Sequence, residues 1–331
     1  MLAIEAGEKG WNSIEFKELL CSAQEYLGVC AVRKIVVKKE TKYITELIYN
    51  IKETGCSHYF YDPRTGSQMA IKGIWESLCT AAVFGFYGII PIVYLTDISV
   101  RRHRAQGAVV SVLGGVAISF MSAKIIKPIF PHGRIVGPSL MPFSKLLLSQ
   151  INNILSINRF QRPVQVLFVG SLYEPRLSKL NRMKEQLSKE GITFVIKGRH
   201  SGGERISDND YWASLCEAQI VVTTADQIDH PDNDWAFINQ LVYRNLEAMA
   251  CGTLLIAPDV PGGRRYFSPG EHYVKYDTPD DAINEIMFYM NNKELGIDIA
   301  DRGRAHASRL IGSKMFWASI DSGLGSDALI S

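Results

Sequence analysis

A carboxylate stands inside an apolar helical run in the stretch YRNLEAMACGTLLIAPDVPGGRRYF, which begins at Tyr243. A helix is predicted over residues 235–250, and on it Asn239, Tyr243 and Glu247 recur every four residues as one polar stripe. A carboxylate near the C-terminal end of a helix is disfavoured by the helix dipole and needs a compensating partner. Glu247 has two candidates: the two hydroxyl groups of a ribose, or the guanidinium of Arg244 three residues earlier.

A glycine pair follows the next predicted strand, TLLIA. Gly262 and Gly263 would let backbone N–H groups approach an anion closely. If a helix begins at Arg264, its N-terminal dipole adds to the positive charges of Arg264 and Arg265. One strand after a helix-borne glutamate, this turn predicts a phosphate site.

Glycine and basic residues also follow two earlier predicted strands. The segment FVGSLYEPR offers Gly170 and Arg176, and FVIKGRH offers Lys197 or Arg199. A glycine at a strand end with fixed cations nearby suits a phosphate group. The alternative is that these cations are solvated on the surface.

The segment TTADQIDHPDNDW gathers several aspartates around His230 after another predicted strand. Its spacing lacks the central glycine and the terminal glutamate of a calcium loop. We therefore predict no metal site, and a solvated acidic loop is the simplest alternative to a binding role.

In the N-terminal half, EAGEKGW places Gly7 and Gly10 between the first strand and a helix capped near Asn12 or Ser13. A glycine loop at a helix N-terminus suits a phosphate or a developing oxyanion. A plain tight turn explains the same residues.

The segment YLTDISVRRHR places Asp97 just beyond a buried strand, with Arg101 and Arg102 following. Asp97 could act as a general base toward a hydroxyl group, and the arginines could hold an anionic substrate. Capping of the next turn is the alternative role for Asp97. Asp62 and Arg64 in YDPRTGSQ stand at another strand end, where a proline-guided turn also explains them.

Strand-like and helical patterns alternate along the whole chain, which predicts repeated β-α-β units. A linker-like stretch over 156–163 separates two such series. We predict an α/β protein with two Rossmann-like domains, residues 1–158 and 159–331, facing each other across a cleft. Ligands in open α/β sheets settle at the carboxyl ends of the strands, so the residues described above lie where a site is expected.

The segment Ser77–Leu95 carries no charge over a length close to the ~20 residues that a membrane span requires. Its glycines and proline favour a helix through Phe86, a turn at Gly88 and a buried strand IIPIVYL. A peripheral surface that touches a membrane is the alternative.

Charge is distributed unevenly, with 17 Lys and Arg against 11 Asp and Glu through residue 158 and 19 against 23 after it. The basic half predicts an anionic partner such as a phosphorylated lipid or a membrane surface, or simply a solvated basic face. No nucleic acid partner is expected. The six cysteines show no C-x-x-C pair, and the N-terminus lacks a signal-peptide pattern, so reduced thiols in the cytoplasm are expected.

From Arg244 through SPGEHYVKYDTPDDAINEIMFYM and RGRAHA, the sequence resembles the C-terminal domain of group 1, family-4-like glycosyltransferases with the GT-B fold, over roughly Pro163–Trp317. The resemblance implies a Glu-x7-Glu motif that binds a nucleotide-sugar, its second Glu holding the ribose and its first contacting the transferred sugar. Glu247 matches the second position. Asn239 stands at the first, a departure from the family pattern.

The same resemblance implies that the Gly262-Gly263 turn lies against the donor and that a basic pair, drawn from Arg176 and Lys197 or Arg199, meets the diphosphate. It also implies that the loop with His230 faces the sugar.

We therefore predict a cytoplasmic, metal-independent and cofactor-free glycosyltransferase of hexosyltransferase type, with peripheral contact to the inner face of the membrane as an open alternative. It would move a sugar from a nucleotide-sugar to a hydroxyl of a lipid- or polysaccharide-linked acceptor. Asp97 and Asn239 are the predicted catalytic residues. A nucleotide-sugar epimerase-like enzyme and a catalytically silent nucleotide- or sugar-binding subunit are the alternatives, and Asn239 keeps the silent subunit open.

Overall fold

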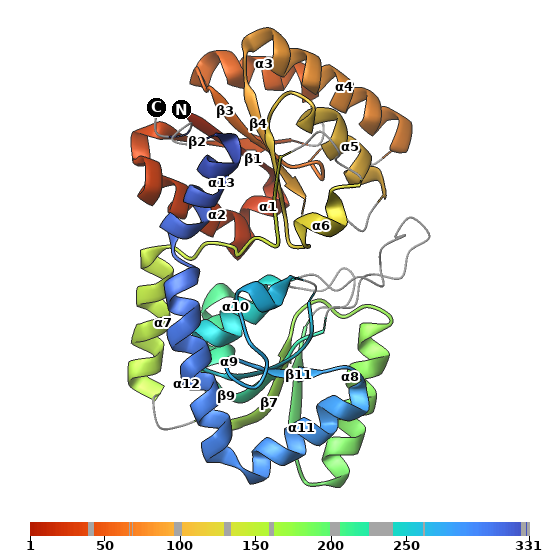
Figure 1. The fold of residues 1–331 in the computed structure, drawn as a ribbon, viewed down its shortest axis with the longest axis vertical. Coiled ribbons are helices and arrows are strands. Elements are labelled where there is room, and N and C mark those ends of the chain that lie inside the picture. The colour runs from red at the N-terminus through yellow and green to blue at the C-terminus, as the bar shows by residue number, and fades with distance from the viewer. Residues whose placement is uncertain are drawn as a thin grey trace. The chain divides into compact units, whose positions relative to one another are not determined.

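A computed structural model describes residues 1–38, 43–65, 67, 69–95, 101–128, 134–158, 162–198, 206–224, 241–260, 262–325 and 329. These residues form two compact units, each built around one parallel sheet with helices between successive strands (Figure 1). In its described parts, the first unit holds Met1–Ser144 and Gly312–Ser331, and the second holds Lys145–Pro231 and Ala236–Ile311. The predicted α/β class with two Rossmann-like units is confirmed.

The sheet of the first unit has the order β2-β1-β3-β4-β5-β6, and every described pairing is parallel. Its central strands are almost wholly buried, as in LAIEAG of β1, because helices cover both faces of a parallel sheet. The strands are β1 (Leu2–Gly7), β2 (Val32–Val37), β3 (His58–Tyr61), β4 (Ile90–Leu95), β5 (Val116–Ser119) and β6 (Arg134–Val136).

Capping residues mark the ends of helices in the first unit. Ser13 is the N-cap of α2 and accepts a hydrogen bond from the Phe16 N–H at 3.3 Å, as predicted for this position. Gly88 ends α4 in the left-handed conformation, with φ of 66°. The helices are α1 (Glu8–Trp11), α2 (Ile14–Leu27), the 3-10 turn η1 (Val29–Ala31), α3 (Tyr43–Thr54), α4 (Ala70–Tyr87), α5 (Arg101–Ser111), α6 (Ala123–Ile126) and α13 (Ser313–Leu324).

The sheet of the second unit has the order β11-β10-β9-β7-β8 and is also parallel. Its apolar side chains pack with those of α8, α11 and α12 into one core that includes Phe168, Ile256 and Ile286. The strands are β7 (Val164–Val169), β8 (Phe194–Lys197), β9 (Ala218–Val222), β10 (Leu254–Pro258) and β11 (Val274–Tyr276).

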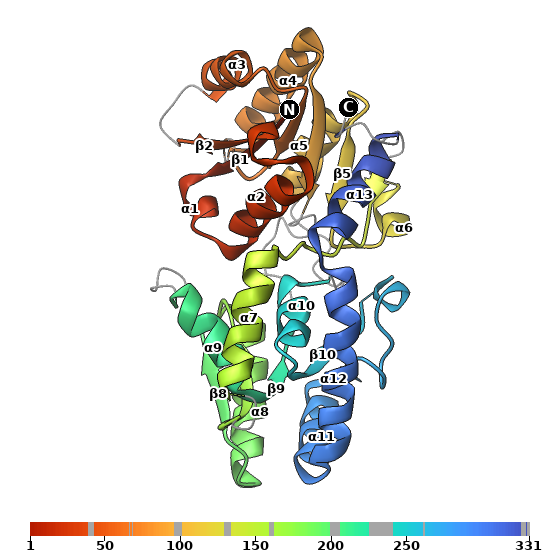
Figure 2. The same cartoon turned by 90° about the vertical axis from the view of Figure 1, so that its left-hand side faces the viewer.

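Helices α7 and α9 run side by side in the second unit (Figure 2). Helix α11 starts with a capping box in which Thr278 and Asp281 satisfy each other's backbone N–H groups. The helices are α7 (Lys145–Asn158), α8 (Arg176–Lys189), α9 (Asp208–Glu217), α10 (Tyr243–Ala250), the 3-10 turn η2 (Gly263–Arg265), α11 (Pro279–Asn291) and α12 (Lys293–Leu310).

The helix predicted over 235–250 is shorter in the structure. Val242 has extended backbone angles and forms the N-cap, so α10 begins only at Tyr243. Tyr243 and Glu247 share one helix face as predicted, whereas Asn239 lies outside the described residues. The predicted three-residue polar stripe is therefore reduced to these two.

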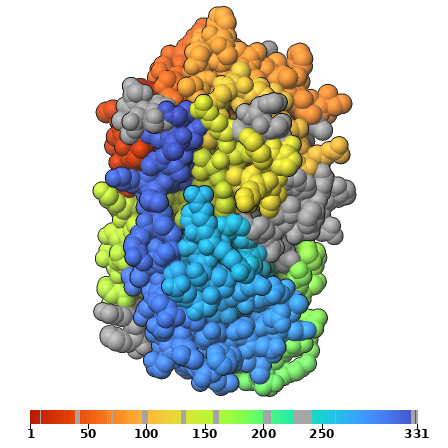
Figure 3. All heavy atoms as spheres, in the orientation of Figure 1, coloured from red at the N-terminus to blue at the C-terminus, as the bar shows by residue number. Residues whose placement is uncertain are grey.

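The second unit has other limits than the predicted 159–331. It begins at Lys145 and ends at Ile311. Helix α7 groups with the second unit, and α13 groups with the first. The fully buried Trp317 of α13 donates to Ser22 Oγ at 3.0 Å and lies at a tilt beside Phe60, with ring centroids 6.5 Å apart, which ties α13 to the first sheet. In Figure 3 the dark blue atoms of this C-terminal segment lie beside the red atoms of the N-terminal residues.

The uncharged segment Ser77–Leu95 divides between α4 and β4 as predicted, with the turn at Gly88 between them. Ile92 and Val93 of β4 are fully buried in the sheet. In the part of the chain that the structure describes, no helix combines the length and apolarity needed to cross a bilayer.

Candidate functional site

Glu247 lies in the middle of α10 with a side chain that is only 3% exposed. The Tyr211 hydroxyl on α9 donates a hydrogen bond to its Oε2 atom. Burial and the neighbouring Glu247 charge raise the pKa of Tyr211 well above its usual value, so this hydroxyl stays a donor. The buried carboxylate is thus held between two helices, and Tyr211 is a partner that sequence reasoning missed.

Arg176 is buried at the carboxyl ends of β7 and β9. Its Nε donates to Thr224 Oγ1 at 2.6 Å and its Nη1 to the Ser171 carbonyl at 3.1 Å. The guanidinium carbon lies 4.2 Å from the Tyr173 ring centroid and 5.8 Å from that of Phe168. The structure therefore fixes a positive charge at the strand ends where the sequence predicted one.

Arg244 brings a second guanidinium to the end of β7. An added Cβ on Gly170 would lie 2.6 Å from the Arg244 Nη1 and Nη2 atoms, so any side chain at this position would displace the guanidinium. The Arg244 guanidinium carbon is 5.6 Å from the same Phe168 ring that Arg176 approaches. Within the described residues, the Arg244 Nε atom is buried without a hydrogen-bond partner.

Arg244 also belongs to the Glu247 cluster. Burial alone would lower its pKa, but the nearby Tyr211 and Glu247 raise it above the usual value. The sequence suggested Arg244 only as an ion-pair partner of Glu247. Its place against Gly170 could not be read from spacing along one helix.

Lys197 was predicted as a diphosphate contact, but its side chain points to the neighbouring helix α9. Its Nζ donates to Ser214 Oγ on α9 at 2.8 Å, and Ser214 in turn donates to the Asp210 carbonyl at 2.6 Å. Arg199, the alternative to Lys197, lies outside the described residues. The paired cations at this edge are thus Arg176 and Arg244 in the part of the chain described here.

The Gly262-Gly263 turn forms as predicted, with Gly262 in the left-handed conformation at φ of 81°. No α-helix starts at Arg264, because η2 is a single 3-10 turn. The Gly263 N–H donates to the Val260 carbonyl at 2.8 Å, and Arg264 forms an ion pair with Asp259 at 2.8 Å. The predicted helix dipole is therefore absent, and Arg264 already has a carboxylate partner.

Several predicted residues cannot be placed at this site. Asp97, Asn239 and His230 lie outside the described residues. Tyr243 forms the first turn of α10 and is partly exposed, one helical turn before Glu247.

In the first unit, the EAGEKGW loop is not an open glycine loop. Residues Glu8–Trp11 form the short helix α1, and Gly7 is its extended N-cap. A Cβ on Gly10 would lie 3.1 Å from Ala6 Cβ, so this glycine serves close packing. Gly7 and Gly10 therefore fit the tight-turn alternative.

Arg101 and Arg102 open helix α5, and Arg101 is exposed. Asp62 is buried and binds the Arg64 guanidinium through both carboxylate oxygens, at 2.9 Å each for the closest pairs. Asp62 and Arg64 thus form an internal ion pair after β3, consistent with a structural turn.

Glu5 is a buried carboxyl group that the sequence reasoning did not single out. It accepts hydrogen bonds from the hydroxyls of Tyr59 at 2.8 Å, Thr65 at 2.9 Å and Tyr43 at 3.2 Å. Burial raises its pKa from 4.5 to about 7, although these hydrogen bonds oppose the shift. Period-two alternation could have flagged it, because Glu5 is a charged residue in a strand whose other residues are apolar.

The described residues contain no group of three or more His, Cys, Asp or Glu side chains placed to hold a metal ion. A cavity of about 720 Å³ exists in the second unit, but it lies at the amino ends of β9 and β10. Parallel α/β sheets bind ligands at the carboxyl edge. We therefore place the candidate donor site with Glu247, Arg176 and Arg244 at that edge, rather than in this cavity.

Comparison with known families and structures places the chain beside glycosyltransferases. Residues 176–310 match the family model described as "Glycosyl transferase-like". This part of the chain therefore has the sequence pattern of a glycosyltransferase-like domain. The matched region starts at Arg176 and includes Glu247 and the Gly262-Gly263 turn, so the resemblance read from the sequence is confirmed.

Solved structures with the GT-B fold are similar to this chain over nearly its whole length. HepE from Anabaena, in complex with UDP-glucose, is 11% identical with a TM-score of 0.62, and the match covers 98% of each chain. Sucrose-phosphate synthase from Thermosynechococcus elongatus is 10% identical with a TM-score of 0.61, covering 98% of this chain and 97% of that one.

A UDP-GlcNAc 2-epimerase from Neisseria meningitidis is also similar, with 10% identity, a TM-score of 0.55 and coverage of 97% and 99%. At such identities these likenesses concern the fold. No protein with a curated description matches the chain by sequence.

Proposed function

We propose that this protein transfers a sugar from a nucleotide-sugar to a hydroxyl group of a lipid- or polysaccharide-linked acceptor. The observation that carries the proposal is the buried Glu247 carboxylate, held by Tyr211 at the same sheet edge as the guanidinium groups of Arg176 and Arg244. A carboxylate suits two ribose hydroxyls, and two cations suit a diphosphate. HepE, which shares the fold, was crystallised with UDP and with UDP-glucose, which supports a uridine nucleotide as the first donor to test.

In this proposal Glu247 accepts the ribose hydroxyls and orients the nucleotide. Arg176 and Arg244 neutralise the charge that develops on the diphosphate as its bond to the sugar breaks. Because both guanidiniums are fixed by packing against Phe168, little reorganisation is needed during the reaction. Catalysis then comes from positioning and electrostatics, without a covalent cofactor.

The acceptor hydroxyl must lose a proton as it attacks the sugar carbon. We propose Asp97 as the general base and Asn239 as a contact of the transferred sugar, the roles that the sequence suggested for them. Lys197 has a smaller part in this scheme because Ser214 holds its ammonium group. A hexose is the sugar class we propose.

We further propose that the enzyme works in the cytoplasm at the inner face of a membrane. All six cysteines are unpaired thiols, as in a reducing compartment. Helix α4 exposes a row of large apolar side chains at helical spacing, here called the α4 face, with exposed fractions of 88% for Ile71, 38% for Ile74, 65% for Trp75, 48% for Leu78 and 83% for Phe86. Such a row within residues 1–158, which hold 17 Lys and Arg against 11 Asp and Glu, fits an anionic lipid surface that carries the acceptor.

The test is to incubate the protein with a panel of nucleotide-sugars and to measure nucleoside diphosphate release with and without lipid-linked glycan acceptors. A glycosyltransferase releases the diphosphate and joins the sugar to the acceptor. An epimerase would instead convert or release the sugar without any acceptor, and a silent binding subunit would bind the nucleotide without turnover. Either of these results would replace the proposed function.

A further inference from the structure

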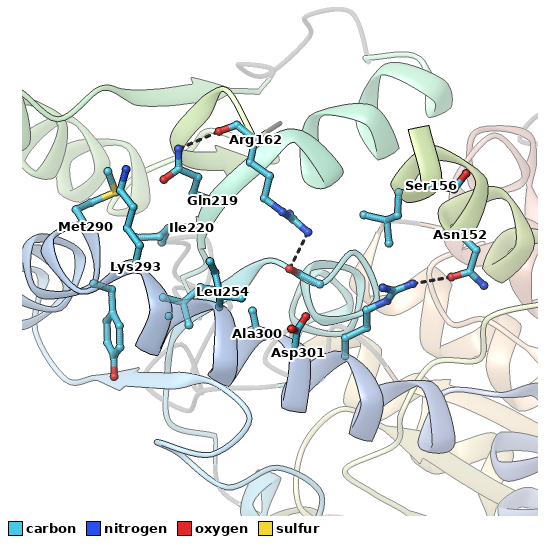
Figure 4. A pocket seen from close by; sticks show the side chains of 16 residues that line it. Asn152, Ser156, Arg162, Gln219, Ile220, Leu254, Met290, Lys293, Ala300 and Asp301 are labelled. Atoms are coloured by element: carbon cyan, nitrogen blue, oxygen red, sulfur yellow. Dashed lines mark hydrogen bonds between the residues drawn. The ribbon is translucent and has the colours of Figure 1, made fainter. Parts of the chain in front are cut away.

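The cavity of about 720 Å³ in the second unit is lined by basic and apolar side chains that take no part in the candidate donor site (Figure 4). It lies where β9 and β10 begin, so it is at the sheet edge opposite to Glu247 and Arg176. Its volume is within the ~300–1,000 Å³ range of small-molecule pockets. It is therefore a separate feature of the domain.

Two arginines converge at one end of this cavity. Arg162 donates to the carbonyls of Ala218, Cys251 and Gly252 at 2.8, 2.9 and 2.8 Å, which fixes its guanidinium. A Cβ added to Gly252 would lie 3.1 Å from Arg304 Cδ and 3.4 Å from Arg162 Nη2. Both side chains therefore pack over the same glycine.

Neither guanidinium has an acidic partner among the described residues. Arg304 donates to the Asn152 Oδ1 atom at 2.8 Å, and no ion pair includes Arg162 or Arg304. Lys293 adds a third cation to the lining, against one carboxylate, Asp301. Burial lowers the pKa of Arg162, so an anion bound beside it would stabilise its charged form.

The remaining walls of the cavity are largely apolar. Leu155, Ile220, Leu254 and Ala300 are buried and line it, and Ile297 lines it with a side chain that is 53% exposed. On α12 the lining residues recur at intervals of three and four from Lys293 to Arg304, so they form one face about 16 Å long. A ligand that fills this space has an apolar body.

We propose that this cavity binds a small amphipathic anion, with a phosphate or carboxylate head between Arg162 and Arg304 and an apolar body against the walls beside Leu155 and Leu254. The head relieves the repulsion between two neighbouring guanidiniums, and the body removes apolar surface from water. This site is separate from the donor site, so its occupant and a nucleotide-sugar bind without displacing each other.

Isothermal titration calorimetry with n-octyl phosphate, kept below its micelle concentration, tests the proposal on the full chain. Inorganic phosphate and neutral octyl glucoside are the comparators. Arg304→Gln removes the charge while keeping a donor for Asn152, and Ile297→Glu adds a carboxylate at an exposed wall position. The matched control is Arg302→Gln on the same helix, because Arg302 is paired with Asp298 at 2.7 Å and does not line the cavity.

Octyl phosphate should bind more tightly than either comparator. Arg304→Gln and Ile297→Glu should each lower the affinity for octyl phosphate by about tenfold or more, and Arg302→Gln should leave that affinity unchanged. Saturating UDP should not compete. Equal binding of octyl glucoside would refute the anion site, and equal binding of inorganic phosphate would refute the apolar part. Unchanged affinity in both cavity variants, with normal melting curves, would refute the location.

Discussion

The Tyr211 hydroxyl on α9 donates its hydrogen bond to the Glu247 carboxylate on α10. A buried carboxylate would otherwise cost several kcal/mol of folding free energy, and a donor from a second helix offsets part of that cost. The pair also orients Glu247, because a hydroxyl from the neighbouring helix α9 binds its Oε2 atom. The first prediction concerns this carboxylate.

Glu247→Gln keeps the shape of the side chain but removes its charge. If Glu247 accepts two ribose hydroxyls, UDP affinity should fall by ~1.5–3 kcal/mol, or roughly ten- to 150-fold, while the fold persists. Calorimetry with UDP, alongside a thermal melting curve, measures both quantities. Tyr211→Phe is the companion variant, and it should weaken UDP binding less because the carboxylate remains. A loss of stability with unchanged UDP affinity would show that Glu247 only pairs with Arg244.

The second prediction separates the two possible cation partners of the diphosphate. Arg244→Gln should reduce UDP affinity by about tenfold or more, whereas Lys197→Gln should have little effect because Ser214 already holds the ammonium group. Gly170→Ala should resemble Arg244→Gln, since a Cβ there would lie 2.6 Å from the guanidinium nitrogens. If Lys197→Gln lowered UDP affinity more than Arg244→Gln, Lys197 of β8 would be the diphosphate contact instead.

The third prediction is metal independence of the transfer reaction. Its basis is the pair of fixed guanidiniums at the strand ends, which can supply the positive charge that a leaving diphosphate needs. Product formation measured in excess EDTA should equal that in untreated enzyme. Abolition by EDTA that added Mg²⁺ or Mn²⁺ reverses would contradict this.

The fourth prediction concerns the α4 face. The protein should float with vesicles that contain acidic lipid, and the binding should weaken with salt because exposed charges are screened over ~10 Å at 0.1 M. A Trp75→Ser/Phe86→Ser variant should bind about tenfold less, since it removes two large apolar groups from the contact. Leu146→Ser on α7 is the control, because Leu146 is 68% exposed but lies in the other unit.

Two results would count against the α4 face. Equal flotation with neutral vesicles would show that lipid charge plays no part in the binding. No flotation at low salt would show that the protein does not bind membranes.

The fifth prediction follows from the raised pKa of Glu5, which is about 7 in the fold against 4.5 in the unfolded chain. A raised carboxyl pKa means that the folded state binds more protons between these values, so its contribution to stability is fully present below pH 4.5 and is lost as pH rises through about 7. The loss amounts to ~3 kcal/mol. Urea unfolding at pH 5 and 7.5 should show this decline in the wild type and a flatter profile in Glu5→Gln. Parallel profiles would mean that Glu5 keeps an ordinary pKa.

Much of the fold was readable from the sequence because its signals are local. Alternation of buried strands and amphipathic helices, the Ser13 cap and the turn at Gly88 all depend on neighbouring residues. The glycosyltransferase resemblance was readable for a similar reason, since Glu247 and the Gly262-Gly263 turn lie close together in the chain. Helix α13 was missed because its tail sequence is weakly patterned and gains its stability by packing Trp317 against the first sheet.

The sequence by itself determined which residue types stand at the strand ends, and therefore which class of ligand we propose. Only the tertiary structure decided which of them meet. Lys197 ends strand β8 and Arg176 follows strand β7, yet Lys197 donates to Ser214 while Arg176 donates to Thr224. Arg244 reaches Gly170 although 74 positions separate them in the chain. Such contacts depend on how helices pack over a parallel sheet, and spacing along one segment carries no information about them.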